Sequence, residues 1–303
     1  MPAATREIKR RIKSVGNTKK VTKAMELVAA SKMRKAQEAA VATRTYALRA
    51  WQLMTHLAAV VDEKTHPLLR RPTEKKNTIL ILITPDKGLT GGLNTNILKE
   101  TSQAIAERGG RNISVVSIGK KGEQAMRRMG KTIVASYPNL SADPKIADIL
   151  PIAHAAIQQF AAGEVDEVLV TYANFISVLV QKPMTRQLLP ITREGLKEVI
   201  EATGKDETFA LEDENLPDDL LFEPNPDVVL EAMLMRLTEM QLYDMLLEAV
   251  ASEHSARMMA MRNATDAAED LIEALTLAFN KARQAGITQD LAEISASRIA
   301  LGD

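Results

Sequence analysis

The chain has 303 residues, no cysteine and a formal net charge of zero. Without cysteine there is no disulfide framework, no cysteine-ligated zinc site and no thiol nucleophile. Aromatic residues make up only 3% of the chain, and with abundant Ala and Met this favours helix-on-helix packing over a β-sandwich. No apolar run approaches the roughly 18 residues of a membrane-spanning helix, so we expect neither membrane insertion nor a secretory signal.

The first predicted element is a long helix from Thr5 to about Val61. It contains no proline, a single glycine, Gly16, and mostly strong helix formers. A partial apolar stripe follows it: Ile8, Ile12, Val15, Val21, Met25 and Val28. Because the step from Val15 to Val21 does not fit a heptad, we expect the packing seam to shift, or the helix to bend, at residues 16–18.

The middle of the chain, residues 77–190, alternates predicted strands with predicted helices. The strands are expected at Thr78–Thr84, Asn112–Ile118, Glu167–Tyr172 and Ile176–Gln181. The helices are expected at Leu93–Arg108, Lys120–Met129 and Ile146–Ala161. The first strand is a continuous apolar run, which is typical of a strand buried on both faces. This alternation predicts a Rossmann-like α/β domain with a mostly parallel sheet, its last two strands forming a hairpin.

After an acidic loop region at 191–226, a second long helix is predicted over 227–303. An apolar stripe runs along it in steps of 4 and 3: Met233, Leu237, Met240, Asp244, Leu247, Ala251, His254, Met258, Met261, Thr265, Ala268, Ile272, Leu275 and Phe279. A mean step near 3.5 residues is the period of a left-handed coiled coil. The predicted fold is therefore α/β plus a long antiparallel coiled coil, with residues 1–62 and 227–303 pairing as a shaft.

The net charge of zero conceals two segments of opposite charge. Residues 1–44 hold twelve Lys and Arg against three acids, and residues 193–227 hold three against twelve. Either segment alone would be an ordinary solvated surface, but together they indicate surfaces for different partners. The basic helix is expected to meet an acidic surface. Nucleic acid is not expected, because aromatic and base-reading signatures are absent.

The only candidate for ligand chemistry is the loop at residues 84–94, between a predicted strand and a predicted helix. Phosphate-binding loops occupy that position, but this loop has neither a P-loop ending nor a G-x-G-x-x-G pattern. The four histidines form no metal-binding pair, and no serine lies in a G-x-S-x-G elbow. The sequence thus indicates a non-catalytic protein with no catalytic residue, cofactor site or metal site. Two alternatives stay open: a coiled-coil scaffold that binds a partner, and a nucleotide-dependent enzyme using Gly88–Gly92.

Motifs in three parts of the chain identify a family. They are Arg6–Val15 with Thr22–Met33 in the first helix, Asp86–Asn94 after the first strand, and Ser252–Met258, Met261–Ala268 and Asn280–Ile294 in the last helix. In this order, and over almost the whole chain, they resemble the gamma subunit of F-type ATP synthases.

The resemblance implies a central-stalk rotor with no chemistry of its own. In that family the paired helices lie inside a ring of alternating alpha and beta subunits, and the α/β domain stands on a membrane ring of c subunits. Proton or sodium flow turns the rotor, which drives the beta subunits through their conformations for ATP synthesis or hydrolysis. The resemblance also implies an epsilon partner and a peripheral place on the cytoplasmic face of the bacterial inner membrane.

Family resemblance also implies roles for individual residues. Lys23 and Met25 match the shaft segment that faces an acidic loop of beta. Three residues match polar positions that hydrogen-bond to the surrounding ring: Arg257, Gln284 and Thr288. Met25 is at the same time a candidate for the coiled-coil core.

The foot of the rotor and its tip carry two further expectations. Phe222-Glu223-Pro224 resembles the family's foot, which places Glu223 against the c ring. Near the tip, Arg298 introduces a charge where the family usually has small residues. The cysteine-bearing insertion of the chloroplast proteins is missing, so thiol regulation is not expected.

Overall fold

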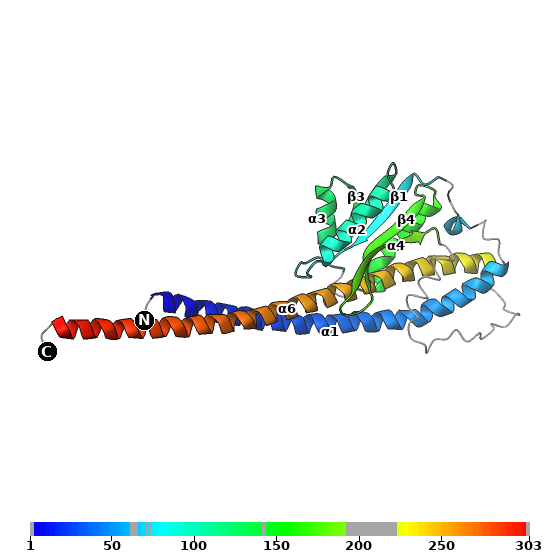
Figure 1. Cartoon of the computed structure of the whole chain (residues 1–303). Helices are drawn as coiled ribbons and strands as arrows, with labels where there is room; N and C mark the ends of the chain where they lie inside the picture. Colours follow the sequence, from blue (N-terminus) through cyan, green and yellow to red (C-terminus); the bar gives the residue numbers. More distant parts are fainter. Residues whose placement is uncertain are drawn as a thin grey trace. The chain divides into compact units, whose positions relative to one another are not determined.

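The computed structural model describes residues 3–60, 66–70, 72, 74–140, 144–191 and 223–300. The chain forms two compact units, one made of Met1–Ser31 with Arg257–Asp303 and the other of Lys32–Ala256. We call them the helical-pair unit and the α/β unit. Two long helices, α1 (Ala3–Val60) and α6 (Pro226–Ala300), contribute to both units (Figure 1). The prediction of one long helix at each end is confirmed.

The α/β unit contains a five-stranded sheet with the order β3-β2-β1-β4-β5. Its strands are β1 (Asn77–Ile83), β2 (Asn112–Ile118), β3 (Thr132–Tyr137), β4 (Glu167–Phe175) and β5 (Gln181–Leu189). The connecting helices are α2 (Leu93–Glu107), α3 (Lys120–Arg128) and α4 (Ile146–Ala161), and a short 3₁₀ helix, η1, covers Pro67–Leu69. Strands β1 to β4 are parallel, and β5 is antiparallel to β4. The predicted mostly parallel sheet is confirmed.

The central strands β1 and β4 are buried on both faces, as the apolar run of β1 predicts. On one face, α4 and the part of α6 that belongs to this unit form a core with the sheet, and Phe160 and Leu246 are fully buried there. On the other face, α2 and α3 form a second core around Met126. Consecutive residues of β1 point to opposite faces, so Ile81 joins the first core and Leu82 the second.

The sequence prediction missed β3. This strand is at the edge of the sheet, parallel to β2, and follows a turn at Gly130, which has a φ of +65°. Its residues are exposed or only half-buried, so its short apolar segment is too weak a signal to stand out between two helices.

The last strand was predicted in the wrong place. Residues Ile176–Gln181 were expected to be the second strand of the hairpin, but Ile176–Val180 form its turn and β5 follows at Gln181–Leu189. In that turn, Ser177 and Val180 exchange backbone hydrogen bonds of 3.0 and 3.2 Å. The pairing with β4 is confirmed. The error arose because the turn is apolar and the strand itself is polar.

A charged cluster ties together the edge of the sheet where β1, β2 and β4 begin. Glu167, the first residue of β4, is buried, and its carboxylate is paired with Lys75, Arg108 and Arg111. The neighbouring Asp166 accepts hydrogen bonds of 2.9 Å from the backbone N–H groups of Asn77 and of the residue before it. These contacts fix the start of β4 against the start of β1.

Asp166 is expected to make the stability of the α/β unit dependent on pH. Its pKa is lowered, first by the backbone hydrogen bonds from Asn77 and Lys76 and further by the charges of Arg70 and Lys76. A carboxyl whose pKa is lower in the folded state stabilises the fold above its unfolded pKa and loses that contribution as the pH falls through the folded pKa. We therefore expect Asp166→Asn to flatten the fall in the free energy of unfolding below about pH 4.

Urea unfolding at a series of pH values, followed by circular dichroism, measures this effect. A variant whose stability falls with acid as steeply as that of the unchanged chain contradicts the prediction.

Candidate coupling surface on the paired helices

In the helical-pair unit, α1 and α6 are held together by polar contacts as well as apolar ones. The hydroxyls of Thr22 and Thr265, both buried, are 2.7 Å apart and hydrogen-bonded. Lys19 Nζ forms an ion pair of 2.9 Å with Glu269 Oε1. Lys19 lies three residues before Thr22 on α1, whereas Glu269 lies four residues after Thr265 on α6. The two helices are therefore antiparallel, as predicted.

The stripe by which α1 packs is an unbroken heptad. The residues on it are buried or half-buried: Thr5, Ile8, Ile12, Val15, Lys19, Thr22, Glu26, Ala29, Met33, Ala36 and Ala40. The expectation that the seam shifts at residues 16–18 is therefore wrong. Val21 and Val28, which were assigned to the stripe, are 58% and 57% exposed. A stripe traced through apolar residues alone goes wrong between Val15 and Ala29, because the three packing positions there are polar: Lys19, Thr22 and Glu26.

The stripe predicted on α6 is confirmed. Every one of its residues from Met233 to Phe279 is buried or half-buried, including the three that break the apolar rule, Asp244, His254 and Thr265. A polar side chain is tolerated at Thr265 because its hydroxyl is hydrogen-bonded to that of Thr22 across the seam.

Large apolar side chains also face outward from the helical pair. On α1 these are Val21, Leu27 and Val28, and on α6 they are Leu271, Leu277, Ile287, Leu291 and Ile294. If the register set by Thr22 and Thr265 continues, Ala3 lies opposite the turn of α6 near Gln284. The part of α6 after that turn extends past the described start of α1. Its exposed apolar residues Ile287, Leu291 and Ile294 are spaced i, i+4 and i+7, so they share one helix face.

The residues predicted to contact the ring lie on the helical pair but do not form one cluster. Lys23 is exposed and its Nζ contacts Glu26 Oε2 at 3.0 Å, whereas Met25 is half-buried. On α6, Arg257 is half-buried, and both Gln284 and Thr288 are exposed. At 1.5 Å per residue, Arg257 and Gln284 are about 40 Å apart along the helix. They can only serve an extended surface.

Glu223, the predicted foot residue, belongs to the α/β unit and is exposed, three positions before α6 begins. The rest of the acidic segment predicted as loop and foot, residues 192–222, lies outside the described residues, as does the side chain of Arg298.

Two side chains of the loop considered for nucleotide binding, Thr84 and Asp86, accept hydrogen bonds from the start of α3. Asp86 accepts hydrogen bonds from the backbone N–H groups of Lys120 and Asn139, at 3.1 and 3.0 Å. Thr84 Oγ1 accepts one from the N–H of Gly122 at 2.8 Å. Helix N-termini bind phosphate through such free N–H groups. At the start of α3, the N–H groups of Lys120 and Gly122 instead donate to a carboxylate and a hydroxyl of the loop that follows β1.

Metal binding and membrane crossing find no support in the described residues. Among them, no three His, Asp or Glu side chains gather as a metal site would require. None of the helices in the described ranges combines the length and the apolar character that crossing a membrane demands.

Comparison with protein families and curated proteins gives matches over the full length of the chain. A family model described as "ATP synthase" matches residues 4–301. An ATP synthase gamma chain of Herpetosiphon aurantiacus is 44% identical over 308 residues, which cover 99% of each chain. Gamma chains of Chloroflexus aurantiacus and Heliobacterium modesticaldum are 42% and 40% identical, with at least 98% of each chain covered.

Solved structures share the fold. A chain of the Tetrahymena thermophila mitochondrial ATP synthase central stalk and c-ring matches with a TM-score of 0.58 and 26% identity, over 80% of this chain and 99% of that one. A chain of the Euglena gracilis mitochondrial ATP synthase rotor matches with a TM-score of 0.59 and 18% identity, over 94% of this chain and 99% of that one.

Proposed function

The chain belongs to the family of ATP synthase gamma chains, and on that premise we propose that its helical pair turns inside a ring of alternating alpha and beta subunits. It is a central-stalk rotor and a non-catalytic part of an ATP synthase, which contains F1 subunits and a c-ring. The rotor favours different conformations of the catalytic beta subunits at different angles, and so changes their affinity for nucleotide. An epsilon subunit completes the stalk.

The observation that carries this proposal is the antiparallel helical pair, with its polar contacts inside and its apolar side chains outside. A rotor needs a fixed register between its helices, and a buried polar contact such as Thr22–Thr265 disfavours a slipped register. A rotor also needs a surface that the surrounding ring of subunits can contact. The outward-facing Val21, Val28 and Leu277 are apolar side chains that such a ring covers.

We assign contacts with the partner subunits to individual residues as follows. Lys23 and Met25 face an acidic loop of beta, and the excess of twelve basic residues over three acids in residues 1–44 supports an acidic partner there. Arg257, Gln284 and Thr288 hydrogen-bond to the ring at successive heights along α6. Glu223, exposed before the start of α6, contacts the c ring at the foot.

We place the complex on the cytoplasmic face of a bacterial inner membrane, where proton or sodium flow through the c ring drives it. The three gamma chains compared above come from bacteria, which supports this location. The chain itself is attached through the c ring in this proposal and inserts no segment of its own.

Reconstitution tests the function. The chain is mixed with alpha and beta subunits of the same organism, and complex formation and ATP hydrolysis are measured. We expect a stable complex whose hydrolysis is lost when the chain is left out. If the chain does not associate with partners that do assemble around another gamma subunit, the rotor function is wrong, and the alternative of a coiled-coil scaffold returns.

Arg257→Ala tests the coupling surface. Arginine is enriched among the few interface residues whose truncation costs more than about 1 kcal/mol, so coupled ATP synthesis in reconstituted vesicles is expected to fall about fivefold. The free energy of unfolding of the isolated chain is expected to fall by no more than about 1 kcal/mol, the typical cost of a single substitution, because Arg257 is only half-buried. Arg262→Ala, at an exposed position on the same helix, is the matched control. Equal losses of synthesis and of stability in Arg257→Ala contradict the assigned role.

A further inference from the structure

Inside the α/β unit, one face of α6 is polar although it packs against the sheet. Glu248, Ser252 and Ser255 are spaced i, i+4 and i+7, so they lie on this one face, which we call the polar face of α6. Both serines are fully buried, and Leu246 and Val250 nearby on the helix belong to the apolar core. A buried hydroxyl costs free energy unless it is hydrogen-bonded. The partners of these serines therefore decide how α6 is oriented on the sheet.

Both serine hydroxyls donate to backbone carbonyl oxygens of the β4–β5 hairpin. Ser252 Oγ donates to the carbonyl oxygen of Ala173 in β4 at 2.9 Å, and Ser255 Oγ donates to that of Val178 in the turn at 2.8 Å. Pro183 is opposite Ala173 in β5 and has no N–H group. Ser252 thus satisfies a carbonyl to which Pro183 cannot donate. The two bonds join α6 to two successive parts of the hairpin.

The third member of the polar face, Glu248, acts on Tyr172 of β4, whose side chain is fully buried. Burial raises the pKa of the Tyr172 hydroxyl, and the negative charge of Glu248 raises it further, so the hydroxyl keeps its proton. Arg186 of β5 is near the same hydroxyl, and its positive charge acts in the opposite direction. An acid of α6 and a base of the sheet therefore lie close to one buried hydroxyl, which adds to the contacts that orient the helix.

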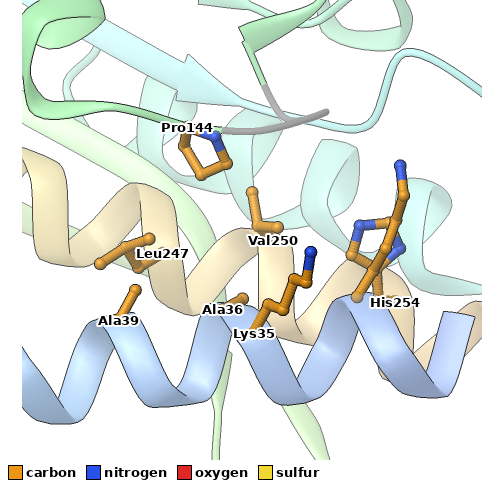
Figure 2. A pocket seen from close by; sticks show the side chains of 8 residues that line it. Lys35, Ala36, Ala39, Pro144, Leu247, Val250 and His254 are labelled. Carbon is orange, nitrogen blue, oxygen red and sulfur yellow. The ribbon is translucent and has the colours of Figure 1, made fainter.

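The contact of the same part of α6 with α1 is of a different kind. Figure 2 shows a cavity between them, with a volume of about 80 Å³. Its lining includes Ala36 and Ala39 of α1, Leu247, Val250 and His254 of α6, and Pro144 before α4. The methyl groups of the two alanines are too short to fill the space beside the larger side chains of α6. Apolar contacts are non-directional, and here they are also incompletely packed.

These two contacts differ in how they resist a turn of α6 about its own axis. A hydrogen bond weakens steeply when its angle departs from linearity, so the bonds of Ser252 and Ser255 oppose such a turn. The apolar contact with α1 beside a cavity opposes it less. Helix α6 continues without a break from Pro226 to Ala300, and so leads from the α/β unit into the helical-pair unit.

We propose that the polar face of α6 is the joint through which torque passes from the α/β unit into the helical pair, with Ser252 and Ser255 as positioning residues for coupling. The inference rests on the proposed function, in which the α/β unit carries the foot of the rotor. It goes beyond that function because both serines are buried inside the subunit, whereas the assigned coupling residues contact partner subunits.

Combining Ser252→Ala with Ser255→Ala tests the joint in the complete ATP synthase, reconstituted in vesicles. Each buried hydrogen bond typically shifts a conformational equilibrium by a factor of about five, so coupled ATP synthesis is expected to fall at least about threefold when both are lost. ATP hydrolysis by the complex with alpha and beta subunits alone is expected to stay unchanged, because the helical pair inside the ring is unaltered.

The angular fluctuation of the rotor measures the joint more directly. The chain has no cysteine, so Lys99→Cys on the exposed surface of α2 gives one attachment point for an optical probe. The ring is immobilised, hydrolysis is stalled, and the angle of the probe is recorded. Loss of the two hydrogen bonds is expected to raise the variance of this angle at least about twofold. A serine that only stabilises the fold would leave this variance unchanged.

Ser102→Ala is the matched control. The Ser102 hydroxyl donates to the carbonyl oxygen of Leu98 within α2 itself, at 2.8 Å, so it joins no two elements. Its loss is expected to leave synthesis and angular variance unchanged. Ser255→Ala alone is measured beside the double variant, and is expected to give a smaller effect in the same direction. It keeps the test decisive where the double variant folds poorly.

The outcomes separate this inference from the function on which it rests. If Ser255→Ala and the double variant leave both synthesis and angular variance unchanged, the joint is overturned and the rotor function stands. Equal losses of synthesis and of hydrolysis overturn the joint too, because they place the defect inside the ring. If the unchanged chain does not assemble with its partners, both the joint and the rotor function are wrong.

Discussion

Replacing Gly119 by alanine is expected to cost more than about 4 kcal/mol of the free energy of unfolding of the α/β unit, a loss seen only where a specific structural mechanism operates. Gly119 precedes α3 and has a φ of +92°, a backbone conformation that residues other than glycine rarely adopt. A Cβ atom there would lie 1.8 Å from the carbonyl oxygen of Thr84. That oxygen belongs to backbone at the end of the central strand β1, so it cannot move aside at low cost.

Urea unfolding of the isolated chain measures this loss, and Gly16→Ala is the matched control. Gly16 lies within α1, and a methyl group at this position would meet no neighbouring atom within 4 Å. Alanine is there expected to raise the stability of the helical-pair unit by about 0.5–1 kcal/mol, the difference in helix propensity. A Gly119→Ala variant within about 1 kcal/mol of the unchanged chain shows that the turn before α3 can rearrange.

Glu167→Gln is expected to lower the free energy of unfolding by about 3 kcal/mol. The carboxylate is buried at the start of β4 and is the common partner of Lys75, Arg108 and Arg111. Removing one member of a buried ion pair is strongly destabilising because the remaining charges lose their compensation. The three cations are partly exposed, so water recovers part of the loss, and the expected value stays at the lower end of that range.

The measurement is again urea unfolding, with Glu164→Gln as the control. Glu164 is three positions earlier and exposed, so its substitution is expected to change stability by less than about 0.5 kcal/mol. Similar effects of the two substitutions mean that the network around Glu167 contributes little. A large loss for Glu167→Gln alone confirms that the edge of the sheet depends on this one buried charge.

Periodicity along the chain was sufficient to predict the long elements. The stripe of α6 and the continuous apolar run of β1 repeat a simple pattern, and such repetition is visible without knowledge of neighbouring elements. The order of motifs along the chain was likewise enough to identify the family, because it depends on the sequence alone. The bounds of β2 and α4 were predicted correctly for the same reason: each is a clearly patterned segment between turn residues.

Only tertiary structure decided the elements whose neighbours determine their state. β3 is an edge strand stabilised by its pairing with β2, and β5 is a polar strand stabilised by its pairing with β4. Neither pairing leaves a strong pattern in its own segment. The apolar turn at Ile176–Val180 was mistaken for the strand because apolar character alone does not show which backbone groups are paired.

The candidate site shows the same division. The sequence placed the proposed coupling residues on two long helices, but it assigned Val21 and Val28 to the packing seam, and both face outward. The polar contact of Thr22 with Thr265 joins residues 243 positions apart, and the cavity beside Lys35 and His254 combines three distant segments. A sequence pattern reports the periodicity within one element, whereas these features come from the register between elements, which is set only when the chain packs.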